Sequence, residues 1–173
     1  LTQSPARMRE YVDAPRPAAF LCDELLPALH ARYPLRDDAS GRALMGASLG
    51  AVASLTAAWR RPGLFGRLLL KSGSFMVTEA SFHGRDPLFA HIHGVIAAFR
   101  RNPGEVPPRI FVSCGLYEGL IDQNRAMVAF LREHGADVLF VEALDGHHWQ
   151  NWRDQLRVGL AWVFPETAAD GGQ

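Results

Sequence analysis

A serine between two glycines, at Gly46-Ala47-Ser48-Leu49-Gly50, has the spacing that can hold its hydroxyl as a nucleophile. The pattern G-x-S-x-G is typical of a strand that turns sharply into a helix, where small residues let the backbone segments approach closely. A short apolar run precedes this motif and a stretch of helix-forming residues follows it. We therefore predict that Ser48 is a nucleophile; the alternative is a Gly/Ser turn without chemistry.

A serine hydroxyl is a weak nucleophile unless a base accepts its proton and a carboxylate orients that base. Two histidines, His147 and His148, follow one later apolar run, and two acids, Glu118 and Asp122, follow another. The order serine, acid, histidine along the chain is the order found in α/β hydrolases. Asp122 is also explained as a first-turn residue that complements a helix dipole.

The elements that would position these side chains are strands and helices in alternation. A short run at 42–45 leads into the serine motif, and continuous apolar runs, as expected for strands buried on both faces, occur at 68–70, 110–112 and 138–141. Helical patterns occupy 18–33, 51–60, 86–101, 120–134 and 149–164. This alternation predicts an α/β fold with a mostly parallel sheet between helical layers. The loops that carry the serine, the acids and the histidines would then meet at the carboxyl edge of the sheet.

Details of the helices can also be predicted. Pro27 should kink the first helix, and Asp86 and Pro87 should begin the third. Gly135 should end the fourth. In the last helix, one face would carry an apolar stripe made of Trp152, Leu156, Leu160 and Val163.

Composition excludes several classes of protein. The 173 residues hold 18 basic and 18 acidic side chains, so there is no electrostatic reason to expect nucleic acid or an anionic membrane as a partner. No apolar run reaches the length of a membrane span. The two cysteines, Cys22 and Cys114, lie in separate apolar runs and are expected to be buried free thiols.

Several stretches together resemble the Putative esterase family of α/β hydrolases, which includes enterochelin esterases, feruloyl esterases, esterase D and mycolyltransferases. The siderophore-esterase branch is the most similar. The stretches are Arg9 to Tyr11, Phe20 to Pro27, Gly46 to Gly50, Lys71 to Phe75, Cys114 to Ile121 and Asp145 to Trp152. The resemblance implies an α/β-hydrolase three-layer sandwich and a serine carboxylesterase, acting on a siderophore trilactone or a similar small-molecule ester. An acyltransferase with the same triad and a non-catalytic binding module are the alternatives.

The resemblance also assigns roles to residues. Ser48 would be the nucleophile, His147 the base and Glu118 the acid, with Asp122 and His148 as the alternatives. The family pattern around the base has a glycine pair before it and an acid after it, where this chain has Asp145 and His148.

Other residues receive weaker expectations. The N–H of Leu49, directly after the nucleophile, would donate to the oxyanion. Trp149 and Trp152 would pack within the last helix, with substrate binding by Trp149 as the alternative. His91 and His93 are two residues apart on a helix and do not share a face, so no metal site is expected, and no cofactor is implied.

We expect one esterase domain at 18–165, preceded by a loop or truncated end at 1–17 and followed by a tail at 166–173. Only 47 residues precede Ser48, too few for the strands and the second oxyanion loop that come first in this fold. The chain is therefore expected to lack those strands, to expose the edge of the strand near Ala43 and Leu44, and to form a homo-oligomer. A cytoplasmic location is expected unless sequence upstream of Leu1 carries a signal.

Overall fold

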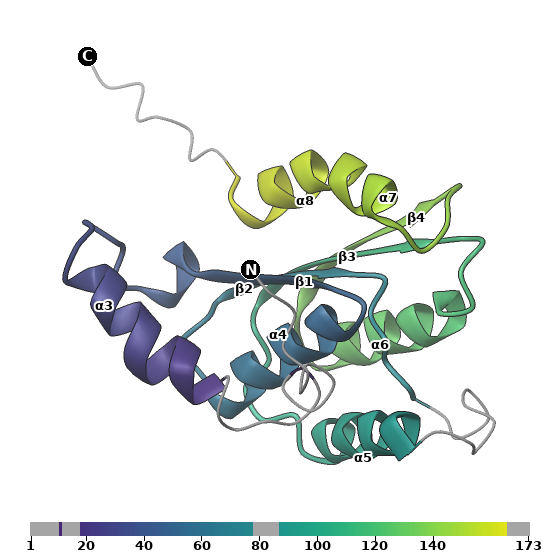
Figure 1. Cartoon of the computed structure of the whole chain (residues 1–173), viewed down its shortest axis with the longest axis horizontal. Helices are drawn as coiled ribbons and strands as arrows, with labels where there is room; N and C mark the ends of the chain where they lie inside the picture. Colours follow the sequence, from purple (N-terminus) through teal and green to yellow (C-terminus); the bar gives the residue numbers. More distant parts are fainter. Residues whose placement is uncertain (1–10, 12–17, 78–86, 166–173) are drawn as a thin grey trace.

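The computed structural model describes residues 11, 18–77 and 87–165. Four parallel strands form one sheet in the order β1-β2-β3-β4, in which each strand pairs with the next one along the chain. Helices α4, α5 and α6 lie on one side of the sheet, and α7 and α8 lie on the other (Figure 1). The predicted α/β sandwich with a parallel sheet is confirmed. The strands are β1 (Ala43–Ala47), β2 (Arg67–Lys71), β3 (Arg109–Gly115) and β4 (Asp137–Ala143).

The middle residues of β2 and β3 are all apolar, and they are buried on both faces of the sheet. In β2, Leu68 and Leu70 belong to the larger core, together with residues of α4, α5 and α6, whereas Leu69 belongs to a smaller core under α8. Phe111 of β3 joins Leu69 in that smaller core. Successive side chains of a strand point to opposite faces, so a continuous apolar run fills both cores at once.

The helices near the start of the chain differ in detail from the prediction. The turn η1 (Phe20–Leu25) is π-helical, and the N–H of Leu26 donates to the carbonyl of Leu21. Helix α3 (Leu26–His30) then begins, with Pro27 in its first turn, and the 3-10 turn η2 (Ala39–Gly41) precedes β1. The irregularity thus precedes Pro27, which lacks the N–H needed for a regular helical bond to the preceding turn.

Helices α4 (Leu49–Arg60), α5 (Pro87–Arg101) and α6 (Ile121–Glu133) match the predicted segments closely. The C′ residue Gly135 has φ 87°, as expected for a glycine that ends a helix. The proposed N-cap Asp86 lies outside the described residues. Both cysteines, Cys22 and Cys114, are buried and free, as predicted.

The last predicted helix is two helices, α7 (Trp149–Asp154) and α8 (Leu156–Val163). The predicted stripe is wrong at Leu160, which is 43% exposed. The residues of α8 that are buried are Gly159 and Val163. A Cβ on Gly159 would lie 2.7 Å from the ring of Phe111, so the glycine lets α8 pack directly on the sheet, a contact that a count of apolar residues does not reveal.

Strand β1 lies at one edge of the described sheet, where it pairs with β2. Ala43 and Leu44 are half-buried and Met45 is 56% exposed.

Within the described residues, no helix is long and apolar enough to cross a membrane.

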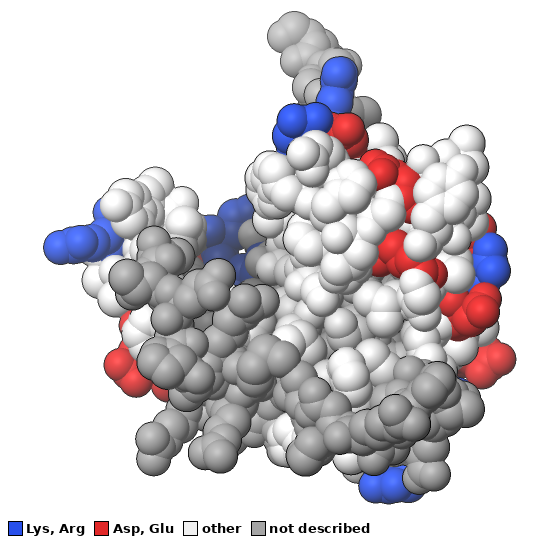
Figure 2. All heavy atoms as spheres, turned by 45° about the vertical axis from the view of Figure 1, so that its right-hand side comes forward, with Lys and Arg blue, Asp and Glu red and all other residues white. Residues whose placement is uncertain are grey.

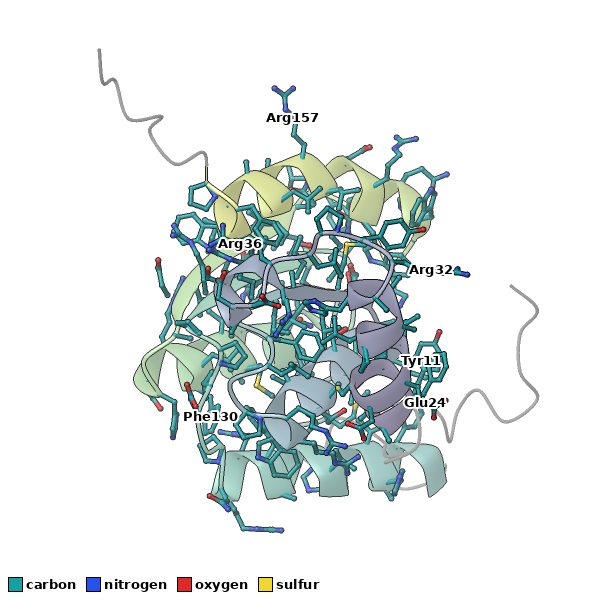
Figure 3. All side chains as sticks on the ribbon, turned by 90° about the vertical axis from the view of Figure 1, so that its left-hand side faces the viewer. Tyr11, Glu24, Arg32, Arg36, Phe130 and Arg157 are labelled. Carbon is teal, nitrogen blue, oxygen red and sulfur yellow. The ribbon has the colours of Figure 1, made fainter. Side chains whose placement is uncertain are left out.

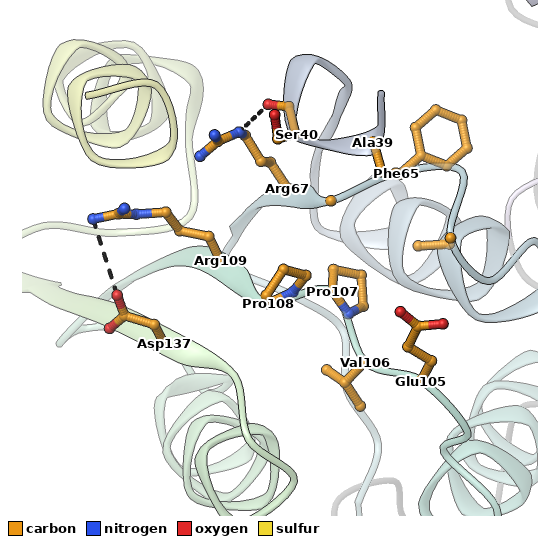
Figure 4. A pocket seen from close by; sticks show the side chains of 13 residues that line it. Ala39, Ser40, Phe65, Arg67, Glu105, Val106, Pro107, Pro108, Arg109 and Asp137 are labelled. Carbon is orange, nitrogen blue, oxygen red and sulfur yellow. Dashed lines mark hydrogen bonds and ion pairs between the residues drawn. The ribbon is translucent and has the colours of Figure 1, made fainter. Parts of the chain in front are cut away.

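A cavity of about 370 Å³ opens at the amino edge of the sheet. The first residues of three strands, Arg67, Arg109 and Asp137, help to line it (Figure 4). Figure 3 looks onto this edge, with α8 and its outward-pointing Arg157 above the sheet and α5 below it. The sequence motifs follow the opposite ends of the strands, so this cavity is not the place where they meet.

Candidate active site

Ser48 occupies a strained turn between β1 and α4. Its φ of 57° and ψ of −120° are unusual for a residue with a side chain, and such a conformation costs about 1–3 kcal/mol. Its N–H donates to the Lys71 carbonyl of the neighbouring strand at 2.9 Å. A Cβ on Gly46 would lie 2.0 Å from the Gly50 carbonyl oxygen, so this turn requires glycine at that position. The sequence spacing therefore produces the sharp turn that the motif predicts.

The hydroxyl of Ser48 lies 3.2 Å from the hydroxyl of Ser74, which follows β2. The N–H of Ser74 also donates to the Ser48 carbonyl at 3.3 Å. Among the described residues, no hydrogen bond joins Ser48 to a histidine. The nucleophile candidate is thus held against the segment after β2, at the carboxyl edge of the sheet.

His147 and Glu118 are in direct contact at this same edge. The Nδ1 atom of His147 lies 2.7 Å from Oε2 of Glu118. The Glu118 side chain is 1% exposed and that of His147 is 39% exposed. A buried carboxylate against one ring nitrogen of a partly exposed histidine is the arrangement that orients a general base.

Backbone hydrogen bonds join the loops that carry these two side chains. The N–H of Leu116 donates to the Ala143 carbonyl at 2.8 Å, and the N–H of Tyr117 donates to the Asp145 carbonyl at 3.1 Å. The second oxygen of Glu118, Oε1, accepts from the N–H of Gly115 at 2.8 Å. The pairing of β3 with β4 therefore continues into the loops and fixes the acid beside the histidine.

The two alternative residues have other partners. His148 lies 2.7 Å from the carboxylate of Asp145, which is 37% exposed. Asp122 is 88% exposed and pairs with Arg125 at 3.1 Å. Neither alternative contacts the pair of His147 and Glu118 through a hydrogen bond in the described part of the chain.

Three large, mostly apolar side chains are exposed near the carboxyl edge. Tyr117, Leu144 and Trp149 are 76%, 79% and 65% exposed; Tyr117 is next to Glu118, Trp149 is two residues after His147, and Leu144 precedes Asp145 in the loop after β4. Figure 2 brings this edge forward and shows a described surface that is mostly white, with acidic side chains near its right-hand part and a few basic ones at its margins. The expectation that Trp149 packs within its helix is wrong, because its ring faces solvent. Trp152 instead lies edge-on to His147, with ring centroids 5.1 Å apart.

The buried thiol of Cys114 lies near the carboxyl end of β3. Burial, followed by the charge of Glu118, raises the pKa of the Cys114 thiol to about 12, so it is not a thiolate at neutral pH. Within the described ranges, no group of three or more histidine, cysteine, aspartate or glutamate side chains could hold a metal ion.

Leu49 is the first residue of α4. Its N–H is therefore one of the first N–H groups of that helix, which have no acceptor within the helix.

Lys71, the single lysine in the sequence, ends β2 as a buried amine. Its Nζ donates to the Trp152 carbonyl at 2.6 Å, and burial lowers its pKa below the usual 10.5. The native state therefore binds this proton more weakly than the unfolded chain does, and this lysine makes stability rise with pH between the lowered pKa and 10.5.

We expect that lysine labelled with ¹³C at Cε will give one signal, with a titration midpoint below 10.5 in the folded protein and a return to the usual value in urea. A folded-state midpoint at or above the usual value would contradict the burial seen here.

The sequence prediction gave no role to Ser72, Ser74 and Asn151, and it treated Trp152 as a packing residue. All four contact the site residues. The available signal was the polar run that directly follows the apolar strand Leu68 to Leu70, because it must lie at the same sheet edge as Ser48.

The chain is similar to named esterases in sequence and in structure. It is 33% identical over 164 residues to an iron(III) enterobactin esterase of Dickeya dadantii, covering 88% of this chain and 37% of that protein. The corresponding enzyme of Escherichia coli is 30% identical over 141 residues, covering 79% and 33%. The crystal structure of ferric enterobactin esterase from Salmonella typhimurium has a TM-score of 0.73 at 27% identity, covering 93% of this chain and 40% of that one.

This chain spans about a third of the length of these curated relatives. A family model described as "Putative esterase" matches residues 3–163. That range holds the strained serine and both loops that bring His147 to Glu118. The match covers most of the sequence, and on this ground the chain belongs to the Putative esterase family.

Proposed function

We propose that this chain carries the nucleophile, base and acid of a carboxylic ester hydrolase. The observation that carries the proposal is the 2.7 Å contact between His147 and the buried carboxylate of Glu118, at the sheet edge where the strained Ser48 turn lies. Membership of an esterase family supports the same chemistry.

The roles follow from the order of proton transfers. Ser48 Oγ attacks the ester carbonyl carbon while Nε2 of His147 takes its proton. The Glu118 carboxylate holds the resulting imidazolium, and the N–H of Leu49 donates to the oxyanion of the tetrahedral intermediate. His147 then gives the proton to the leaving alcohol oxygen, and water releases the acyl group from Ser48 by the same steps. Catalytic hydrogen bonds often shorten only when substrate binds, so the contact between Ser48 and Ser74 in the free protein is compatible with this sequence.

For the substrate, we propose an ester of the siderophore type whose acyl groups are aromatic. Two relatives are named as iron(III) enterobactin esterases. In this chain, Tyr117 precedes the acid and Trp149 follows the histidines, and both rings are largely exposed. Exposed aromatic rings beside the reacting groups supply a stacking surface for an aromatic acyl group. We assign Trp149 to substrate binding.

The proposal is tested with a fluorophosphonate probe and with hydrolysis of p-nitrophenyl butyrate. We expect covalent labelling of the folded chain, and its complete loss in Ser48→Ala, because the probe traps an activated serine. Ser54→Ala is the matched control, because Ser54 is a buried serine of the next helix whose hydroxyl donates to the Gly50 carbonyl within α4.

A folded sample that neither labels nor hydrolyses the ester would contradict the proposal and favour a non-catalytic binding module. An acyltransferase would be favoured by a different result: the chain is labelled by the probe, and with an added alcohol it forms a new ester from the acyl group and releases no free acid.

A further inference from the structure

We propose that Ser72 is a positioning residue. Its hydroxyl accepts a hydrogen bond from the Trp152 indole and donates one to Glu118, and it thereby fixes the carboxylate against His147. This inference rests on the proposed function for the roles of Glu118 and His147. Its structural basis is a chain of hydrogen bonds among groups that lie far apart in sequence.

The direction of this chain is set by chemistry. The indole N–H of Trp152 lies 2.9 Å from the Ser72 hydroxyl and is a donor only. The hydroxyl has one proton, and Oε1 of Glu118 lies 2.7 Å away as an acceptor. Ser72 must therefore accept from Trp152 and donate to Glu118.

Glu118 needs this donor because its carboxylate is nearly completely shielded from water. Oε1 accepts from Ser72 and Gly115, with Asn151 farther away at 3.4 Å, while Oε2 faces His147. Because donors hold both oxygens, the carboxylate cannot rotate away from this orientation without losing hydrogen bonds. The Ser72 hydroxyl thus helps to hold the carboxylate with one oxygen on the histidine.

The backbone at Ser72 supports a functional role. Ser72 is fully buried and has φ 46°, and Ser48 is the other non-glycine residue with a positive φ in the described part of the chain. Strain of this kind persists only where the surroundings enforce it, and it clusters at functional sites. Here the buried side chain of Asn124 holds the backbone of Gly73. The Gly73 N–H donates to Oδ1 of Asn124, and Nδ2 of Asn124 donates to the Gly73 carbonyl, each at 3.0 Å.

Trp152 connects the acid and the base. Its ring lies edge-on to His147 at an interplanar angle of 87°, while its N–H reaches Glu118 through Ser72. Its carbonyl accepts from the buried Lys71 amine, which precedes Ser72. Lys71 and Ser72, at the end of β2, therefore both bond to the tryptophan that contacts the histidine, and Ser72 also bonds to the acid.

The test compares Ser72→Gly and Ser72→Ala. Both variants remove the hydroxyl, but glycine adopts φ 46° without strain, so Ser72→Gly separates loss of the donor from loss of stability. We expect kcat for p-nitrophenyl butyrate to fall about 10- to 100-fold in both variants, with KM within about threefold of wild type. Thr56→Val removes a buried hydroxyl that bonds only within α4, and it should leave kcat unchanged.

The second measurement does not depend on activity. In ¹H–¹⁵N spectra, the indole signal missing from Trp152→Phe identifies Trp152 among the four tryptophans. We expect this signal, and that of the His147 Nδ1 proton, to shift in Ser72→Gly and not in Thr56→Val. If wild type does not hydrolyse esters, the proposed function fails, and the two signals still decide whether Ser72 holds the acid and histidine.

The proposal is overturned if Ser72→Gly leaves kcat within twofold of wild type or leaves the His147 signal unshifted. It is also overturned if Ser72→Ala loses activity but Ser72→Gly does not, because the loss would then reflect stability alone.

Discussion

Replacing His147 with alanine is expected to lower kcat for ester hydrolysis by roughly 10⁴- to 10⁶-fold, whereas His148→Ala should change it by less than about tenfold. Both histidines lie 2.7 Å from a carboxylate, so distance does not distinguish them. Burial does, because the Glu118 side chain is 1% exposed and that of Asp145 is 37% exposed. A carboxylate shielded from water holds its histidine more firmly than one screened by solvent.

The contact also fixes the tautomer of the base. The ionised Glu118 carboxylate accepts only, so Nδ1 of His147 must carry a proton and Nε2 is left as the basic nitrogen. His148 is more exposed, and its Nε2 is the atom that faces Asp145. Steady-state kinetics of both variants, with circular dichroism to confirm folding, measure the difference. A larger loss in His148→Ala would make His148 the base.

Glu118→Gln is expected to lower kcat by roughly 10³- to 10⁴-fold, although it changes the size of the side chain very little. The donors at Oε1 include Ser72 and Gly115, so the amide oxygen of glutamine must take that position. The NH₂ group then faces Nδ1 of His147, where two donors would oppose each other. The histidine proton moves to Nε2, and this nitrogen no longer accepts the proton of Ser48.

Asp122→Asn is the matched control, because this acid is 88% exposed and pairs with Arg125 outside the network. It should leave kcat within about twofold. Activity of Glu118→Gln within tenfold of wild type would show that a serine and a histidine suffice. A larger loss in Asp122→Asn than in Glu118→Gln would transfer the orienting role to Asp122.

The sequence by itself determined the fold class and the edge at which the site lies. Continuous apolar runs such as Leu68 to Leu70 and Ile110 to Val112 indicate strands buried on both faces, and these runs became β2 and β3. Parallel strands place all of their carboxyl ends at one edge, so the loops with Ser48, Glu118 and His147 had to meet there. The turn at Ser48 was also predictable, because the steric requirement for glycine at Gly46 arises within five residues.

The tertiary structure decided which histidine meets which acid. His147 and His148 are adjacent, and the backbone at His148 is extended, with φ −154° and ψ 166°, which directs successive side chains to opposite sides. Adjacent residues of the same type therefore reach different partners, Glu118 and Asp145. No spacing rule along the chain separates them, because the choice depends on how the loops after β3 and β4 pack together.

The break between α7 and α8 and the role of Ser72 were also beyond the sequence. The helix breaks at Gln155, and Gly159 then packs on Phe111 of β3, a contact across 48 residues. Ser72 reaches Glu118 across 46 residues and Trp152 across 80. Local patterns determine which elements form because they depend on near neighbours, whereas the hydrogen bonds that orient the acid exist only after distant segments have packed.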